Sequence, residues 1–138
     1  MSAEEHKTLI RRLFEQGFNR GRLSIVDEIF QPDFVDRSTP DQPPGIQGVK
    51  DYMAMVRTGF PDIAVTIEDL VAAEDRVVVR TTWRGTHQGT YEGVPPTGKQ
   101  ATRTMIQIFR VAGGKLMEEW SEGEGLGQQI LSNNQNNK

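Results

Sequence analysis

The chain has 138 residues, of which 36% are hydrophobic and 25% are charged, with a formal net charge of −3. These values predict one soluble globular domain, and a pI near 5.4 argues against the basic surface of a nucleic-acid-binding protein. The absence of cysteine excludes disulfides and thiolate chemistry. No secretory signal pattern opens the chain and no apolar run approaches the ~20 residues of a membrane span. We therefore expect a cytoplasmic protein without membrane contacts.

Three segments in the first half of the chain have the apolar period of amphipathic helices: residues 3–18, 23–30 and about 47–59. Gly21 is suited to end the first helix, and Ser24 is suited to cap the second. Between the second and third helices, residues 33–38 predict a short strand, and a proline-rich loop follows.

The second half of the chain predicts strands. Alternating or β-rich runs occupy residues 63–75, 76–87, 99–112 and 115–124, and Gly113–Gly114 predicts a tight hairpin turn. Helices before strands indicate an α+β fold, with the helices on one side of an antiparallel sheet. We assign residues 1–131 to one domain and expect residues 132–138 to form a polar, disordered tail. We expect no helix of useful length after residues 123–128.

The order of elements and three motifs resemble the SnoaL-like polyketide cyclases, also called ester cyclases, within the NTF2-like superfamily. The motifs are "FPDIAVTIEDLVAAEDRVVVR", "WRGTHQGTYEGVPPTGKQ" and "IFRVAGGKLMEEW", within a similarity over roughly residues 5–131. The resemblance implies an NTF2-like cone, with three N-terminal helices packed on a highly curved antiparallel β-sheet around a pocket for a small apolar ligand. It also implies an intramolecular aldol reaction, with a carboxylate as general acid/base and no metal or organic cofactor.

The chain departs from the family pattern at two positions. In that pattern an aspartate follows the tryptophan of the last strand and pairs with a histidine fourteen residues earlier. Here Ser121 and Gln107 occupy these places, and neither is a general base by itself at neutral pH. Three hypotheses follow: a cyclase or isomerase that uses another carboxylate on a carbonyl compound, a non-catalytic binder of a hydrophobic small molecule, and a structural module whose pocket its own side chains fill.

Strand alternation identifies the carboxylate that could replace the missing aspartate. If Ser121 faces the pocket, Glu119 and Met117 share its face, because side chains alternate with a period of two. Glu119 is then the candidate general base, and the alternative is an ion pair with Arg103 across the hairpin. A β-bulge near Gly123 would reverse the assignment beyond it. The predicted substrate-binding wall consists of Arg103, Met105, Gln107, Phe109, Met117 and Ser121.

Two further residues are catalytic candidates. Asp36 is the second possible base, although we expect Arg37 to keep it ionised in a structural pair. His87, in the "GTHQG" motif, either donates to a substrate oxygen or anchors its loop. Two separated histidines and no cysteine predict no metal site.

The residues on the opposite face of the last two strands indicate a protein partner. Trp120, Ile106 and Ile108 alternate with the pocket residues and therefore point to the outer face of the sheet. An apolar outer face in a small protein indicates a homodimer.

Overall fold

The computed structural model describes residues 2–43 and 45–136. The predicted helices and strands are present, with bounds close to those expected. The elements are α1 (Ala3–Arg12), the π-helical turn η1 (Leu13–Phe18), α2 (Ile25–Ile29), β1 (Phe30–Asp36), α3 (Ile46–Gly59), β2 (Ala64–Ala73), β3 (Arg76–Thr86), β4 (Gln100–Ala112), β5 (Lys115–Gly123) and α4 (Leu126–Asn136).

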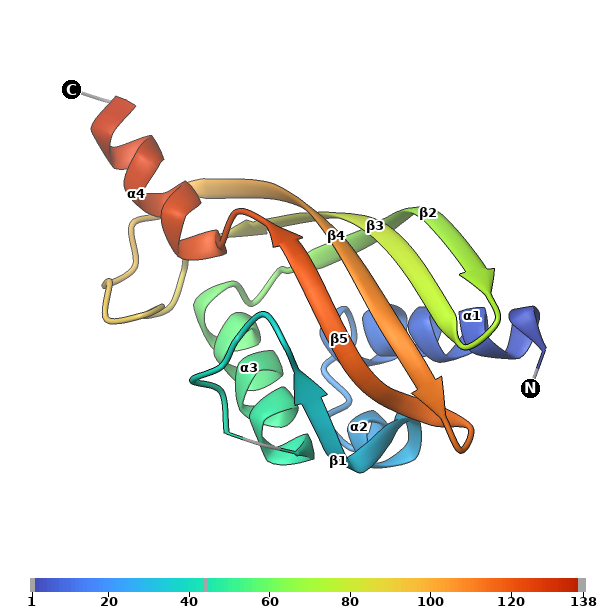
Figure 1. Cartoon of the computed structure of the whole chain (residues 1–138). Helices are drawn as coiled ribbons and strands as arrows, with labels where there is room; N and C mark the ends of the chain where they lie inside the picture. Colours follow the sequence, from blue (N-terminus) through green and yellow to red (C-terminus); the bar gives the residue numbers. More distant parts are fainter. Residues whose placement is uncertain (1, 44, 137–138) are drawn as a thin grey trace.

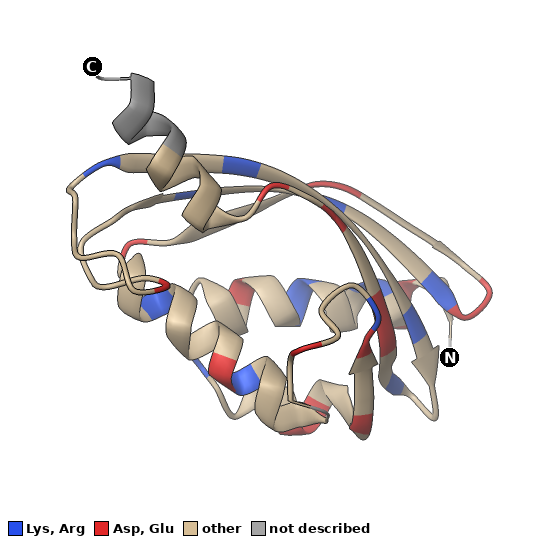
Figure 2. Cartoon of the chain, turned by 60° about the vertical axis from the view of Figure 1, so that its left-hand side comes forward, with Lys and Arg blue, Asp and Glu red and all other residues tan. Residues whose placement is uncertain are grey.

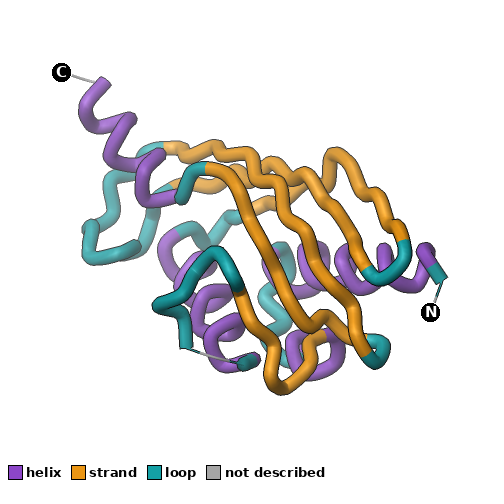
Figure 3. The backbone as a smooth tube through the Cα atoms, in the orientation of Figure 1, coloured by secondary structure: helices purple, strands orange, loops and turns teal. Residues whose placement is uncertain are grey.

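The elements form two layers, which confirms the α+β class (Figures 1 and 3). The strand order is β1-β5-β4-β3-β2, and helices α1 to α3 lie against one face of this sheet. Helix α1 packs on β2 and β3, whereas α3 packs beside β1. Apolar side chains from both layers are buried between them, and this burial stabilises the fold.

The prediction of a wholly antiparallel sheet is wrong at one edge. Strand β1 pairs with β5 in parallel, with Asp36 opposite Glu119, so the sheet is mixed. The reason is that β1 follows α2 and leads into α3, instead of joining its neighbour through a hairpin. The sheet bends over the helices without curling strongly, and its edges β1 and β2 stay apart, so the predicted highly curved cone is corrected to an open sheet.

The end of the chain also differs from the prediction. Helix α4 follows β5, where the sequence indicated no helix of useful length. Its residues Leu126 and Ile130 are fully buried, so packing against the body of the protein stabilises a helix that the polar composition did not suggest. The tail expected at 132–138 overlaps the last five residues of α4, and residues 137–138 lie outside the described part of the chain.

Charged residues are distributed over the whole fold. Acidic and basic residues are interspersed along both the helices and the strands (Figure 2). Within residues 2–43 and 45–136, no helix is long and apolar enough to cross a membrane.

Candidate functional site

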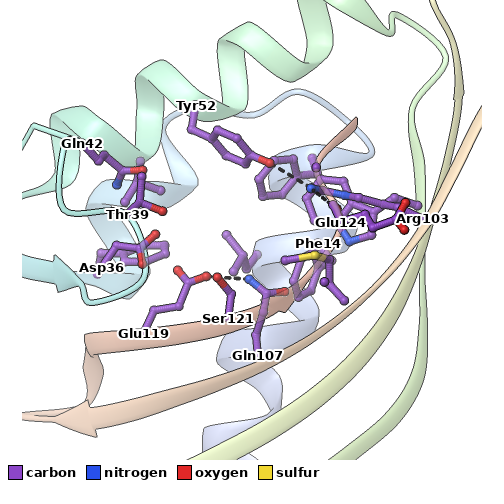
Figure 4. Close-up of a pocket in the computed structure, with 18 residues that line it drawn as sticks. Phe14, Asp36, Thr39, Gln42, Tyr52, Arg103, Gln107, Glu119, Ser121 and Glu124 are labelled. Carbon is purple, nitrogen blue, oxygen red and sulfur yellow. Dashed lines mark hydrogen bonds between the residues drawn. The ribbon is translucent and has the colours of Figure 1, made fainter. Parts of the chain in front are cut away.

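A cavity of about 230 Å³ lies between the helices and the inner face of the sheet. Its apolar wall comes from both layers and includes Leu13, Phe14, Phe18, Phe30, Val49 and Trp83. The π-helical turn, in which Asn19 N donates to Phe14 O at 2.9 Å, contributes three of these side chains. Figure 4 shows the polar side chains that face this space.

The cross-strand register explains why the polar side chains meet. Glu119 on β5 lies opposite Asp36 on β1 and opposite Phe109 on β4. Ser121 lies opposite Gln107 in the next inward-facing row. Residues that face each other across paired strands project to the same side of the sheet. Two carboxyl groups, an amide and a hydroxyl therefore line one part of the cavity.

Glu119 is the perturbed acid of the site. Burial beneath the helices, together with the neighbouring charge of Asp36, raises its pKa to about 8, although the hydrogen bond from Gln107 and the charge of Arg103 act in the opposite direction. The amide Nε2 of Gln107 donates a hydrogen bond of 2.6 Å to Glu119 Oε2. Within the described residues no lysine or arginine lies within 4 Å of this carboxylate, so the predicted alternative pair with Arg103 is absent. Near neutral pH, Glu119 can therefore both give and take a proton.

Asp36 also lines the cavity, but the expected pair with Arg37 does not form. The Nε of Arg37 donates to Glu118 on the outer face at 2.7 Å, and Arg110 contacts the same carboxylate. These two arginines lower the pKa of Glu118. Asp36 Oδ1 instead accepts from the backbone N–H of Ser38 at 3.0 Å. Strand alternation is the reason, because it directs Asp36 inward and Arg37 outward.

Arg103 occupies the other polar part of the cavity. It is only 6% exposed, and its guanidinium lies over the Trp83 ring at 4.1 Å from the centroid. One terminal nitrogen donates to Tyr52 Oη at 2.8 Å, and the other donates to the Glu124 carbonyl oxygen at 3.3 Å. Its Nε–H is buried without a partner. Met105, the next inward residue of β4, also lines the cavity.

Two residues of the predicted wall lie elsewhere. Arg110 pairs with Glu118 and Val111 with Leu116, so Met117 is an extra, bulged residue of β5. The bulge takes Met117 out of the alternating pattern, and Leu116 is fully buried instead. Phe109 faces inward but is fully buried in the core and does not line the cavity. The regular register continues to Gly123, so no bulge there reverses the assignment of Glu119 and Ser121.

His87 lies outside the cavity. Its Nδ1 is 2.9 Å from Thr97 Oγ1, and its backbone bonds to Lys99 and Gly98 hold the β3–β4 loop closed. Its ring packs near Phe60 at 5.6 Å. This placement corresponds to the loop-anchoring alternative and not to a contact with a ligand in the cavity.

The sequence analysis did not predict several residues that line the cavity. Thr39 and Gln42 come from the proline-rich loop after β1, Tyr52 comes from the apolar face of α3, and Glu124 follows β5. Loop residues have no period that reveals their direction. Tyr52 was identifiable only as one member of an apolar helical stripe, so its hydroxyl contact with Arg103 required the tertiary structure.

The fold and site together define an α+β protein with an acid-bearing cavity between its helices and its sheet. The family model for SnoaL-like polyketide cyclases matches residues 8–129, and the chain belongs to this family.

Curated relatives agree with this assignment. The chain is 26% identical over 124 residues to the nogalonic acid methyl ester cyclase of Streptomyces nogalater, covering 82% of this chain and 88% of that protein. It is 25% identical over 129 residues to the aklanonic acid methyl ester cyclase DnrD of Streptomyces peucetius, covering 88% of each.

Solved structures share the fold. TsrD from Streptomyces laurentii superposes with a TM-score of 0.86 at 24% identity, covering 94% of this chain and 97% of that one. Wild-type IdmH from Streptomyces antibioticus superposes with a TM-score of 0.73 at 31% identity, covering 91% and 94%.

Proposed function

We propose that this protein is a cofactor-free enzyme that moves a proton next to the carbonyl group of a small, mostly apolar compound, in a cyclisation or isomerisation. One observation supports this most: Glu119 faces the cavity with a raised pKa, hydrogen-bonded to Gln107 and unpaired with any described cation. A base with a pKa near the working pH is the most effective in general acid/base catalysis. The names of the two curated relatives, both methyl ester cyclases, support cyclisation as the reaction class.

The residues of the cavity have distinct roles in this proposal. The Glu119 carboxylate removes a proton from the carbon next to the carbonyl, and the electron pair moves to the carbonyl oxygen as an enolate. The Ser121 hydroxyl, beside Gln107 in the same row, donates to this oxygen. The charge of Asp36 raises the pKa of Glu119. Glu119 therefore holds the transferred proton until it returns it to the product. His87 has no part in the step, because it does not line the cavity.

The alternative is a binder that has lost the family's catalytic pair. Ser121 and Gln107 stand where the family pattern has its aspartate and histidine, and this observation supports the alternative. The two functions differ in whether Glu119 is needed for turnover or only for the shape of the pocket.

The test uses a small ring ketone, 2-tetralone, as the probe. Binding is measured by tryptophan fluorescence, and exchange of its α-hydrogens in D2O is followed by NMR. We expect wild-type protein to accelerate exchange, with a rate that rises with pH and levels off above about 8, because the carboxylate is the active form. Glu119→Gln should lower the rate at least ~100-fold, whereas Glu74→Gln, an exposed glutamate of the turn between β2 and β3, should not change it. Binding without acceleration would establish the binder, and equal rates in Glu119→Gln and wild type would remove Glu119 as the base.

We also propose that a second copy of the chain covers the outer face of the sheet. Val78, Ile108 and Trp120 form one cross-strand row there, next to Ile106, which is 48% exposed. Arg76 and Glu122 lie beside these residues around a shallow hollow, so the patch carries charges of both signs and can be complementary to a second copy of itself. Sedimentation should show a dimer for wild type and a monomer for Ile106→Arg. A wild-type monomer, or an unchanged dimer in the variant, would contradict this interface.

A further inference from the structure

The cavity contains a buried cation that has no counter-ion in the described part of the chain. Arg103 is 6% exposed and forms no salt bridge within 4 Å with any described carboxylate. Glu124, which lines the same part of the cavity, uses its carboxylate to accept from Gln129 and offers Arg103 only its backbone carbonyl. The charge of Arg103 acts on Glu119 only from beyond salt-bridge distance. Buried charges in proteins are normally paired, because leaving water is unfavourable for an isolated ion.

The contacts that Arg103 does make leave donors free. A guanidinium has five N–H donors. Arg103 donates one hydrogen bond from one terminal nitrogen to Tyr52 Oη and one from the other to the Glu124 carbonyl oxygen. The Nε–H has no partner, although it is buried. The Trp83 ring supports the guanidinium plane from one side at 4.1 Å and fixes its orientation. Each terminal nitrogen also has a second N–H beyond the one bond it makes. Free donors on an oriented guanidinium suit a planar carboxylate, which arginine binds through two parallel hydrogen bonds.

The two polar parts of the cavity lie at different positions along the strands. Gln107, next to Glu119, is four residues from Arg103 on β4, which corresponds to about 13 Å along a strand. Figure 4 shows the carboxyl groups of Asp36 and Glu119 in one region and the guanidinium below the Tyr52 hydroxyl in another. At about 230 Å³ the cavity is smaller than typical ligand pockets of roughly 300–1,000 Å³, which favours a small ligand of about two fused rings.

We infer that the ligand carries a free carboxylate, which binds the guanidinium of Arg103 beside Tyr52, while its carbonyl end lies at Glu119. The structure thereby indicates an unesterified acid, in contrast to the methyl esters in the names of the two curated relatives. This inference rests on the proposed function only in taking the same cavity as the ligand site, and it applies to an enzyme and to a binder alike.

The test compares 2-naphthoate with its methyl ester, which has the same rings but no charge. Binding is measured by calorimetry at pH 7.5 to wild type, Arg103→Met and Arg84→Met, the last being an exposed arginine of β3. Wild type and Arg84→Met should bind the acid at least ~10-fold more tightly than the ester, as expected for a desolvated charge pair. Arg103→Met should lose that preference and bind the ester within about threefold of wild type.

A second measurement uses wild-type protein and needs no substitution at a buried position. In wild-type protein, the Nε–H NMR resonance of Arg103 should shift on addition of 2-naphthoate and stay in place with the ester. An ester that binds as tightly as the acid, an unchanged preference in a folded Arg103→Met, or binding of neither probe would overturn the inference. Glu119→Gln should keep the preference for the acid, so failure of the carboxylate site and failure of the proton-transfer function are separate results.

Discussion

Replacement of Glu119, the acid that faces the cavity, should make the protein more stable than wild type at high pH. Burial, together with the charge of Asp36, raises the pKa of Glu119 from 4.5 to about 8, so the native state binds this proton more tightly than the unfolded chain does. Stability from this group is therefore complete below pH 4.5 and decreases as the pH rises toward 8, where the native carboxyl ionises. Glu119→Gln retains the shape and cannot ionise, so it removes this dependence.

The magnitude follows from the size of the shift. A difference of 3.5 pH units between 4.5 and about 8 corresponds to at most about 5 kcal/mol, at 1.36 kcal/mol per unit. Glu119 is only half-buried, because the cavity gives it some access to solvent, so we expect a smaller effect. Between pH 6 and pH 9, the free energy of unfolding of Glu119→Gln should rise relative to wild type by roughly 1–2 kcal/mol.

Urea unfolding at half-unit pH steps measures this difference, with the slope of each transition confirming that the same surface is exposed. Glu74→Gln is the matched control, because it removes one glutamate from an exposed position outside both the cavity and the proposed interface. Its stability curve should run parallel to that of wild type. If the Glu119→Gln curve also runs parallel, the carboxyl is ionised in the native state at neutral pH, and both the shifted pKa and its role as a poised base are refuted.

Four other substitutions, one of them a control, test contacts elsewhere in the fold. A Cβ at Gly89 would lie 2.0 Å from a backbone carbonyl oxygen of α3, so Gly89→Ala should cost at least ~2 kcal/mol in thermal unfolding, whereas Gly125→Ala, with open space around it, should change stability by less than ~0.5 kcal/mol. Leu116→Ala should cost about 2–5 kcal/mol in urea unfolding, because the side chain is fully buried at the bulge; a cost below ~1 kcal/mol would contradict the inward placement. Asp62 accepts from the backbone N–H and the hydroxyl of Thr86, both at 2.7 Å, which lowers its pKa. Asp62→Ala should therefore cost ~1 kcal/mol at neutral pH, and this cost should disappear as the pH falls through the lowered pKa; a cost that does not change with pH would exclude the ionised acceptor.

The sequence predicted most of the elements, because their signals are local. Helical stripes and strand alternation depend on neighbours a few residues apart, and the same alternation assigned Glu119, Ser121, Gln107 and Arg103 to one face. The assignment was wrong for Met117, because a bulge depends on the partner strand and leaves no trace in a single-strand pattern. Helix α4 was missed because its stability comes from two buried side chains and not from its composition.

By itself, the sequence determined the α+β class, the family resemblance and the polarity of each strand face, since all three are properties of residue order. Only the tertiary structure decided which charges pair. Arg37 pairs with Glu118 and not with Asp36, so Asp36 lies beside Glu119 without this cation. Arg103 contacts Tyr52 and Trp83 and does not pair with Glu119. The reason is that the parallel pairing of β1 with β5 joins residues more than eighty positions apart in the chain, and no periodicity in the sequence encodes such a contact.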